Sequence, residues 1–339
     1  MLVEDPLNAE SPREALAPAV TPTDRFFVRT HFPIPRITPS AWRLVIGGAV
    51  DRPRRWSLEQ LRALPQRELA ATLECAGNGR RRYARPAPGE LRWGDHAVGS
   101  AVWRGVPLAT LLEESGLSGE ARHLVFTGAD LDAGSEESRR FVRALAADLE
   151  EHRDVLVALE MNGRPISPEH GAPARLVVPG WYGMAWVKWL EGVTAGPTAY
   201  RGHFQTSRYV YRYRRAGRSV TEPVRRLRVK SLIVTPAPGA GLARGTPVRL
   251  RGKAWSGTGP VVRVEVDVGD GWQAARLLPG HGPYDWSSWE LEWSPRRRGR
   301  IVLRARATDA GGETQPAEPF ANEFQYGCNA IQQVPVEVA

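Results

Sequence analysis

One of the two cysteines in this 339-residue chain stands in the segment TLECAGNGRRR, residues 72–82, where it is followed by an alanine, Gly-Asn-Gly and three arginines. Neighbouring guanidinium groups stabilise a thiolate, and Gly77 and Gly79 allow the backbone to turn tightly around a bulky ligand. A thiolate is a soft ligand that suits a soft or high-valent metal. Free cysteine is also among the most buried residue types, so Cys75 on its own favours a core thiol.

The segments around this cysteine predict a mixed domain over residues 20–225. SLEQLRAL begins like a helix, with Ser57 as N-cap and Gln60 as its capping-box partner, and PLATLLEESGLSG predicts a helix that ends at Gly116 or Gly119. Short strands are expected within residues 42–50, 122–130, 154–163 and 174–180. Helices and strands do not alternate strictly and no phosphate-binding glycine loop is present, so an α+β fold is expected.

The last third of the chain predicts an all-β domain. Residues 261–268 alternate, with the even-numbered valines on one face and Arg263, Glu265 and Asp267 on the other, before a Gly-Asp-Gly turn. PVRLRGKAW alternates in the same way, and WELEW and RIVLRARAT add two more strands. This pattern is typical of an antiparallel, immunoglobulin-like sandwich, which we expect over residues 229–339.

Five segments resemble, in one order and with matching spacing, the sulfite oxidase family of molybdenum enzymes. CAGNGRR is similar to its cysteine motif, FFVRTHFPIP to its Phe-x-x-Arg-Asn-His-x-Pro-x-Pro segment, residues 160–190 to its longest pterin-binding stretch, and GHFQTSRY to the segment with its active-site tyrosine. KSLIVTPAPGAGLARGTPVRLRGKAWSG is similar to the start of its dimerisation domain. The resemblance implies a catalytic domain of sulfite oxidase type over residues 20–225, a molybdenum–molybdopterin cofactor, and a homodimer formed through residues 229–339.

Carried over residue by residue, the resemblance implies how the cofactor is held. Cys75 is expected to be the protein thiolate on molybdenum. The residues expected to bind the pterin and its phosphate are Arg29, Thr30, His31, Asp130, His170, Arg175, Trp186, Val187 and Lys188. The family usually has Asn in place of Thr30 and a smaller residue in place of Trp186. His170 alone would suit a surface histidine and Lys188 a snorkelling strand end, but together with Arg175 they suit a phosphate dianion.

The same resemblance implies a substrate pocket formed by Arg29, Arg80, Trp93 and Tyr209. Two guanidiniums beside a metal-oxo group bind a small oxyanion by charge-assisted hydrogen bonds, and sulfite is the first expectation. Tyr209 is expected to hydrogen-bond the oxo ligand or the substrate. Sulfite-oxidising members carry a further arginine in the C-terminal domain, and none stands at the expected place near Gly282; His281 is the available replacement.

Three functions are open at this point. The first is oxidation of sulfite to sulfate, with electrons passed to an external acceptor such as a cytochrome c, since the sequence has no CxxCH haem motif. The second is a related reductase of nitrate or an S-oxide, although the nitrate-reducing branch usually lacks a tyrosine at position 209. The third is a basic, non-enzymatic binding module, which predicts basic and aromatic residues on one face of the sandwich, where residues 296–298 form the only basic run.

The composition fits a soluble globular protein of two domains, with 42% hydrophobic and 24% charged residues. The formal net charge of +9 agrees with an anionic substrate. The basic residues include only three lysines, Lys188, Lys230 and Lys253, so an overall bias toward arginine explains much of this charge. No leader or membrane span is visible. We therefore expect no membrane insertion, no nucleic-acid partner, and a cytoplasmic location for the chain as given, or a periplasmic one if a leader was removed.

Overall fold

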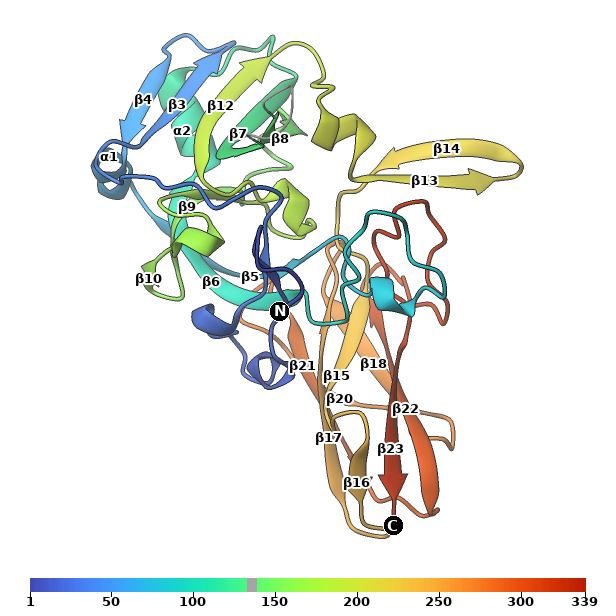
Figure 1. Ribbon diagram of the computed structural model, residues 1–339. Helices are drawn as coiled ribbons and strands as arrows, with labels where there is room; N and C mark the ends of the chain where they lie inside the picture. The colour runs from blue at the N-terminus through green and yellow to red at the C-terminus, as the bar shows by residue number, and fades with distance from the viewer. Residues whose placement is uncertain (133–138) are drawn as a thin grey trace.

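The computed structural model describes residues 1–132 and 139–339 and places a broad N-terminal part beside one end of a long β-sandwich, with the C-terminus at the far tip (Figure 1). The described residues contain two α-helices, α1 (Leu58–Ala63) and α2 (Leu108–Ser115), and strands provide most of the regular structure. The α+β class expected for the N-terminal part therefore holds only in part, because both helices are short and the body of this part is β-sheet.

Two five-stranded sheets form the body of the N-terminal part. The first has the order β10-β9-β6-β5, with β11 also paired to β9, and the second has the order β4-β3-β12-β7-β8. The strands of the first sheet are β5 (Arg67–Glu74), β6 (Val98–Pro107), β9 (Leu156–Met161), β10 (Arg164–Pro165) and β11 (Arg175–Val177). The strands of the second are β3 (Arg43–Gly48), β4 (Arg54–Ser57), β7 (His123–Asp132), β8 (Arg139–Ala146) and β12 (Leu190–Gly196). Both sheets contribute to one apolar core, in which Leu44, Val106 and Phe126 are inaccessible to solvent.

Two small sheets flank this body. Strands β1 (Asn8–Ala9) and β2 (Val28–Arg29) pair near the N-terminus, and β13 (Val210–Arg215) and β14 (Arg218–Pro223) form a hairpin that projects from the molecule (Figure 1). The two strands of each pair are antiparallel. The hairpin begins directly after Tyr209, so an exposed element is joined to a residue of the predicted site.

The C-terminal part consists of two sheets packed around a shared core. Their orders are β15-β17-β21-β20 and β16-β23-β22-β18-β19. The strands are β15 (Lys230–Thr235), β16 (Ala240–Leu242), β17 (Val248–Trp255), β18 (Val261–Asp267), β19 (Trp272–Ala274), β20 (Arg276–Leu278), β21 (Ser287–Trp293), β22 (Gly299–Asp309) and β23 (Gln332–Val338). Leu250 of one sheet and Val264 and Leu303 of the other belong to the same buried cluster. Strands β16 and β23 are parallel, whereas the other neighbouring pairs are antiparallel.

The expected alternation along β18 is wrong at two positions. The register shifts between Val261 and Arg263, so Val261 is buried and Val262 is 56% exposed. Asp267, expected to face solvent, is buried because its Oδ1 accepts hydrogen bonds from the backbone N–H groups of Gly269 and Gly271 at 2.8 and 3.3 Å. A bulge and a turn cap therefore override the simple period of two.

The sandwich packs directly against the N-terminal part. Leu232, Trp255 and Trp286 belong to the apolar core of the N-terminal part, and the Trp286 indole N–H donates to the carbonyl of Ala19 at 2.7 Å. No described helix has both the length and the apolar character needed to cross a membrane.

Candidate active site

A cavity in the N-terminal part gathers most of the residues that the sequence singled out. Its empty space is about 660 Å³, including the open mouth. The predicted residues that line it are Arg29, Thr30, His31, Cys75, Asp130, His170, Arg175, Trp186, Lys188 and Tyr209. Arg80, Trp93 and Val187 do not line it. Widely separated segments thus meet around one space.

Cys75 enters the cavity from the end of β5. Its backbone N–H donates to the carbonyl of Ala97 at 2.9 Å, and its Sγ accepts a hydrogen bond from the N–H of Gly77 at 3.4 Å. Burial raises the pKa of the thiol, while the charges of Arg29 and Arg80 act in the opposite direction. A buried thiol of this kind becomes a thiolate when a metal cation replaces its proton.

The two glycines after Cys75 serve contacts within the protein. A Cβ at Gly77 would lie 2.6 Å from Nη1 of Arg80, and at Gly79, where φ is +88°, it would lie 3.1 Å from Sγ of Cys328. Neither glycine lines the cavity. The expectation that they let the backbone wrap around a ligand is therefore wrong, because they give room to Arg80 and Cys328.

Arg175 is a buried cation that has no carboxylate partner among the residues that the structure describes. It lies on β11 and is 4% exposed, and its guanidinium carbon is 5.0 Å from the ring centre of Trp103 and 5.8 Å from that of Trp186. Nη1 donates to the carbonyl of His170 at 2.9 Å and Nη2 to that of Trp186 at 3.2 Å, while Nε has no partner among the described residues. Burial lowers the pKa of Arg175 to about 9.

Lys188 and Arg29 extend this positive wall. Lys188 Nζ donates to the carbonyl of Glu169 at 2.9 Å and lies 4.1 Å from the ring centre of Trp189, and burial, followed by the charge of Arg175, holds its pKa well below the usual range. Within residues 1–132 and 139–339, no ion pair includes Arg29, Arg175 or Lys188. Three cations without counter-ions around one cavity favour a bound anion.

His170 is neutral and fixed in orientation. It ends the 3-10 helix Pro168–His170, and its Nε2–H donates to the carbonyl of Thr23 at 3.0 Å, which leaves Nδ1 as an acceptor. Burial lowers its pKa to about 4. Gly171 follows at φ +108°, where a Cβ would lie 2.9 Å from Cβ of Lys188, so glycine is required for Lys188 to pack here.

Asp130 lies on β7, where the register is irregular between Thr127 and Leu131. Its Oδ1 is buried and has no hydrogen-bond partner among the described residues. Burial raises its pKa to about 7, and the charge of Lys188 opposes this shift. A carboxyl group that titrates near neutral pH can accept or donate a hydrogen bond to a heterocycle in the cavity.

Tyr209 and His31 form a hydrogen-bonded pair on the cavity wall. The Tyr209 hydroxyl and Nε2 of His31 are 2.7 Å apart, and Tyr209 has an unusual φ of +52° directly before β13. Burial raises the pKa of Tyr209 above its ordinary value, and burial together with the charge of Arg29 holds the pKa of His31 well below its own. The pair is therefore neutral, and the tyrosine hydroxyl can relay a proton with the imidazole.

Arg80 lies behind this wall and its charge is already paired. Its Nη2 is 2.6 Å from Oε2 of Glu90, both side chains are almost fully buried, and its guanidinium lies 4.8 Å from the ring centre of Tyr326. Glu90 also forms an ion pair with Arg208. The sequence did not indicate Glu90, because its distance along the chain from Cys75 follows no motif.

The remaining predicted residues support the wall. Trp93 is fully buried, and its Cδ1 would lie 3.1 Å from a Cβ at Gly77. Val187 is fully buried and accepts a hydrogen bond from the N–H of Leu176, which ties the 186–188 segment to β11. The Thr30 hydroxyl donates to the carbonyl of Leu7 at 2.7 Å. His281 is exposed and lies outside the cavity, so it does not replace the missing arginine.

Sequence reasoning missed Arg143, which lies on β8 and is 3% exposed. Its guanidinium carbon is 5.6 Å from the ring centre of Tyr209, and neither Nε nor Nη1 has a hydrogen-bond partner among the described residues. Burial lowers its pKa to about 10. No motif distinguishes this arginine from the many others in the chain. Trp189 also lines the cavity.

Residues 31–204 match the family described as "Oxidoreductase molybdopterin binding domain", and residues 221–338 match "Mo-co oxidoreductase dimerisation domain". The chain is 35% identical to the sulfite oxidase of Gallus gallus, over 92% of this chain and 72% of that one. It is also 35% identical to the mitochondrial sulfite oxidase of Drosophila melanogaster over 98% of its residues, and spans 62% of the length of that protein. An inducible nitrate reductase of Glycine max is 34% identical over 94% of this chain but only 39% of its own length.

Among solved structures, the sulfane dehydrogenase SoxCD from Paracoccus pantotrophus matches with a TM-score of 0.86 and 31% identity, covering 99% of this chain and 86% of that one. The fold, the cavity and these matches define a molybdenum-dependent oxidoreductase with a molybdenum–molybdopterin cofactor. Within that class, the chain belongs to the sulfite oxidase family. The hypothesis of a non-enzymatic binding module is therefore set aside.

Proposed function

We propose that this protein oxidises sulfite to sulfate at a molybdenum–molybdopterin centre and passes the two electrons to an external acceptor, with a cytochrome c as the expected partner. The observation that carries the proposal is the cavity lined by Cys75 together with Arg29, Arg175 and Lys188, three basic side chains that form no ion pair among the described residues. Within the same residues no group of three or more His, Cys, Asp or Glu side chains could hold a metal. A metal on Cys75 therefore needs ligands from a cofactor, and an anionic cofactor supplies the missing negative charge.

The residues present fit such a cofactor. Arg175 and Lys188 would hold the phosphate, with the unpartnered Nε of Arg175 available as a donor, while Nδ1 of neutral His170 could accept a hydrogen bond from a pterin N–H. Oδ1 of Asp130 is available to a pterin N–H. Cys75 would hold molybdenum as a thiolate. The remaining wall would be formed by Thr30, His31, Trp186 and the backbone around Val187.

When bound, the cofactor supplies the two-electron redox change and the oxygen atom that is ultimately replaced from water. The protein's part is binding and proton handling. Arg29 offers a guanidinium to the anionic substrate on the cavity wall, and Arg143, behind Tyr209, adds positive charge to that side of the site. The hydroxyl of Tyr209 donates to the substrate or accepts from water, and neutral His31, hydrogen-bonded to it at 2.7 Å, fixes the orientation of that hydroxyl. Arg80 and Trp93 fix the shape of the pocket from behind the Cys75 turn.

A second candidate substrate is sulfane sulfur, the sulfur of a persulfide. The similarity to the sulfane dehydrogenase supports it, as does the ion pair of Arg80 with Glu90, which leaves the substrate side less positive than a sulfite dianion would favour. Reduction of nitrate or an S-oxide receives weaker support, because the nitrate reductase relatives match over a smaller share of their length.

The test is molybdenum per chain in wild-type protein and Cys75→Ser, produced in a host that makes the cofactor, followed by reduction of ferricyanide with sulfite or glutathione persulfide. Near-stoichiometric molybdenum that is lost in Cys75→Ser, with faster turnover of sulfite, supports the proposal. Faster turnover of the persulfide selects the second candidate. Wild-type protein without molybdenum refutes both.

We also propose a homodimer built through an immunoglobulin-like domain at residues 229–339, after a catalytic domain at residues 20–225. The match of residues 221–338 to a dimerisation domain supports this arrangement. Mass measurement in solution tests it, and a monomer at micromolar concentration would contradict it. A cytoplasmic location, or a periplasmic one for a processed chain, stays a prediction that fractionation of cells would check.

A further inference from the structure

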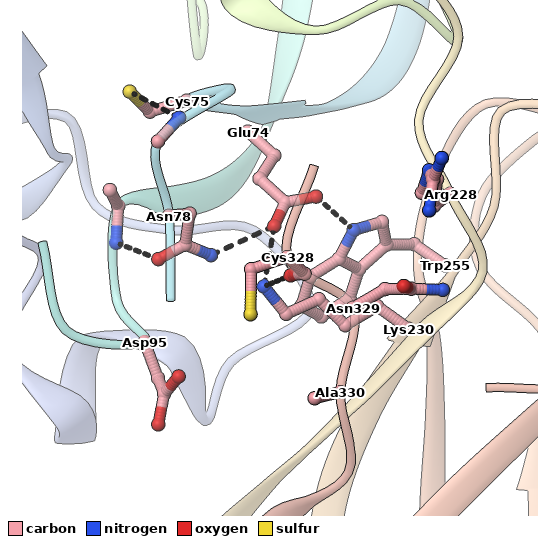
Figure 2. Close-up of polar contacts among 12 residues, drawn as sticks. Glu74, Cys75, Asn78, Asp95, Arg228, Lys230, Trp255, Cys328, Asn329 and Ala330 are labelled. Carbon is pink, nitrogen blue, oxygen red and sulfur yellow. Dashed lines mark hydrogen bonds and ion pairs between the residues drawn. The ribbon is translucent and has the colours of Figure 1, made fainter. Parts of the chain in front are cut away.

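A buried polar network joins the residue before Cys75 to the sandwich (Figure 2). Glu74, the last residue of β5, is 1% exposed, and its carboxylate accepts three hydrogen bonds. Oε1 accepts hydrogen bonds from Nδ2 of Asn78 at 2.9 Å and from Nζ of Lys230 at 2.8 Å. Oε2 accepts a hydrogen bond from the indole N–H of Trp255 at 2.9 Å. Both carboxylate oxygens therefore accept hydrogen bonds, and Oε1 also forms an ion pair with Lys230.

Two of the three donors come from the sandwich. Lys230 begins β15 and is fully buried, and its Nζ also donates to the carbonyl of Cys328 at 2.8 Å. Trp255 ends β17, which pairs with β15 through Lys230 opposite Trp255. Cys328 is 1% exposed, and its backbone carbonyl belongs to this network. The sandwich thus binds the Glu74 carboxylate through Lys230 and Trp255, which lie opposite each other on two adjacent strands.

The third donor links Glu74 to the turn that carries Cys75. The backbone N–H of Asn78 donates to the carbonyl of Cys75 at 2.9 Å, and its Oδ1 accepts from the N–H of Ala97 at 3.1 Å. The N–H of Cys75 in turn donates to the carbonyl of Ala97. Residues 74–78 and Ala97 therefore form one hydrogen-bonded unit. It is joined to the C-terminal part by the Glu74 carboxylate and by the carbonyl of Ala76, which accepts from the N–H of Gly327 at 2.8 Å.

Stability alone does not explain this arrangement. Burying a carboxylate and an ammonium carries a large desolvation cost, and apolar side chains of similar volume often stabilise a protein equally well or better. Lys253, another buried lysine of the sandwich, gives a contrast, because its Nζ donates to the hydroxyl of Ser288 at 2.8 Å and forms no ion pair with a described residue. Glu74, which forms an ion pair with Lys230, lies next to Cys75 in the sequence. Because hydrogen bonds are directional, this pair can hold the turn that carries Cys75 in one orientation.

We propose that Glu74, Lys230 and Trp255 are positioning residues through which the sandwich fixes the orientation of Cys75 toward the bound metal. This inference rests on the proposed function in one respect, the binding of molybdenum by Cys75. It gives the sandwich a role in the geometry of the centre in addition to dimerisation.

The experiment compares wild-type holoenzyme with Lys230→Met and with the isosteric variant Glu74→Gln. Glu74→Gln keeps the inference testable if Lys230→Met does not fold. The readouts are molybdenum per chain, the EPR spectrum of molybdenum in dithionite-reduced protein, and steady-state kinetics. Lys253→Met is the control for loss of a buried ammonium from the same sandwich. Leu250→Ala is the control for loss of sandwich stability, because Leu250 lies in the sandwich core and does not contact the network.

We expect the network variants to show a shifted or broadened EPR spectrum and to lose about 10-fold or more in molybdenum content or kcat, the scale of changes to groups that orient metal ligands. The KM for sulfite should change by less than about 2-fold, because the variants change no side chain that is proposed to contact the substrate. Both controls should keep the wild-type spectrum. A wild-type spectrum and kcat in both network variants would overturn the inference, as would the same spectral change in Leu250→Ala. Absence of molybdenum from wild-type protein would instead refute the proposed function, on which the inference depends.

Discussion

At the scale of single residues, the site contains an arginine whose burial is costly unless an anion binds near it. Arg143 is 3% exposed, has two nitrogen atoms without hydrogen-bond partners among the described residues, and lies 5.6 Å from the ring centre of Tyr209. The groups that raise its pKa against the effect of burial are tyrosines. A cation in this setting destabilises the folded protein and binds an anion strongly, which is a common trade-off at functional sites.

We therefore expect Arg143→Met to affect stability and substrate binding in opposite directions. The free energy of unfolding should rise by about 1 kcal/mol, because an unpaired buried charge is replaced by an apolar chain of similar length. The KM for sulfite should rise about 5-fold, the scale of a through-space charge effect of about 1 kcal/mol, because a positive charge behind Tyr209 is removed from that side of the site. Urea unfolding and steady-state kinetics measure the two effects.

Arg214→Met, at an exposed position of the β13–β14 hairpin, controls for the change in net charge. A stability loss in Arg143→Met with an unchanged KM would show that Arg143 supports the structure and has no part in binding the substrate.

The sequence identified site residues where type and spacing repeat a known pattern, and it failed where the partner depends on the fold. Cys75, His170, Arg175 and Lys188 follow such a pattern, and they line one cavity. The pairing of Arg80 with Glu90 could not be anticipated, because neither residue type nor spacing specifies which carboxylate a buried arginine meets. The sequence therefore predicted which residues lie near the cavity better than it predicted which charged side chains pair with each other.

At the scale of elements, the sequence indicated the helices correctly but underestimated the strands. Both expected helices are present, and α2 ends at Gly116 in a left-handed conformation, one of the two ends considered. Strands β5 and β6 were not predicted. The β5 sequence RELAATLE contains two alanines and no valine or isoleucine, so its local preference for strand is weak, and pairing with β6 along its whole length determines its conformation. Together with β8 and β12, which were also not predicted, these strands make the N-terminal part more β-rich than expected.

The capping box at α1 is an element that the sequence did specify. Ser57 Oγ accepts from the N–H of Gln60 at 3.1 Å, and Gln60 Oε1 accepts from the N–H of Ser57 at 2.8 Å, as predicted. We expect Ser57→Ala to lower the free energy of unfolding by about 1 kcal/mol. Chemical denaturation of the variant measures this loss.

Because α1 is remote from the cavity lining, molybdenum content and kcat of Ser57→Ala should equal those of the wild type. A stability change near zero would mean that the ends of this short helix fray before global unfolding.

At the scale of the whole molecule, burial of neutral histidines makes the stability depend on pH. Burial lowers the pKa values of His96 and His170 to about 4, and it lowers those of His31 and His152 as well. In each case the unfolded chain binds more protons than the folded one between the folded pKa and the ordinary value of 6.5. The contribution of these groups is therefore fully present above pH 6.5 and is lost as the pH falls toward 4.

His96 allows this effect to be measured outside the cofactor cavity. Its share of the unfolding free energy should fall by about 3 kcal/mol between pH 7 and pH 4, since one pKa unit corresponds to about 1.4 kcal/mol. Glu10, whose carboxylate accepts the N–H of His96 at 3.3 Å, acts in the opposite direction, because burial raises its pKa and protonation at low pH removes that cost. The experiment is urea unfolding at several pH values for wild type and His96→Gln. Glu10 and the backbone N–H of residue 96 are present in both proteins, so the effect of Glu10 cancels in the comparison. His96→Gln should lose less stability than wild type on acidification, and parallel curves would show that the pKa of His96 in the folded protein lies near its ordinary value of 6.5.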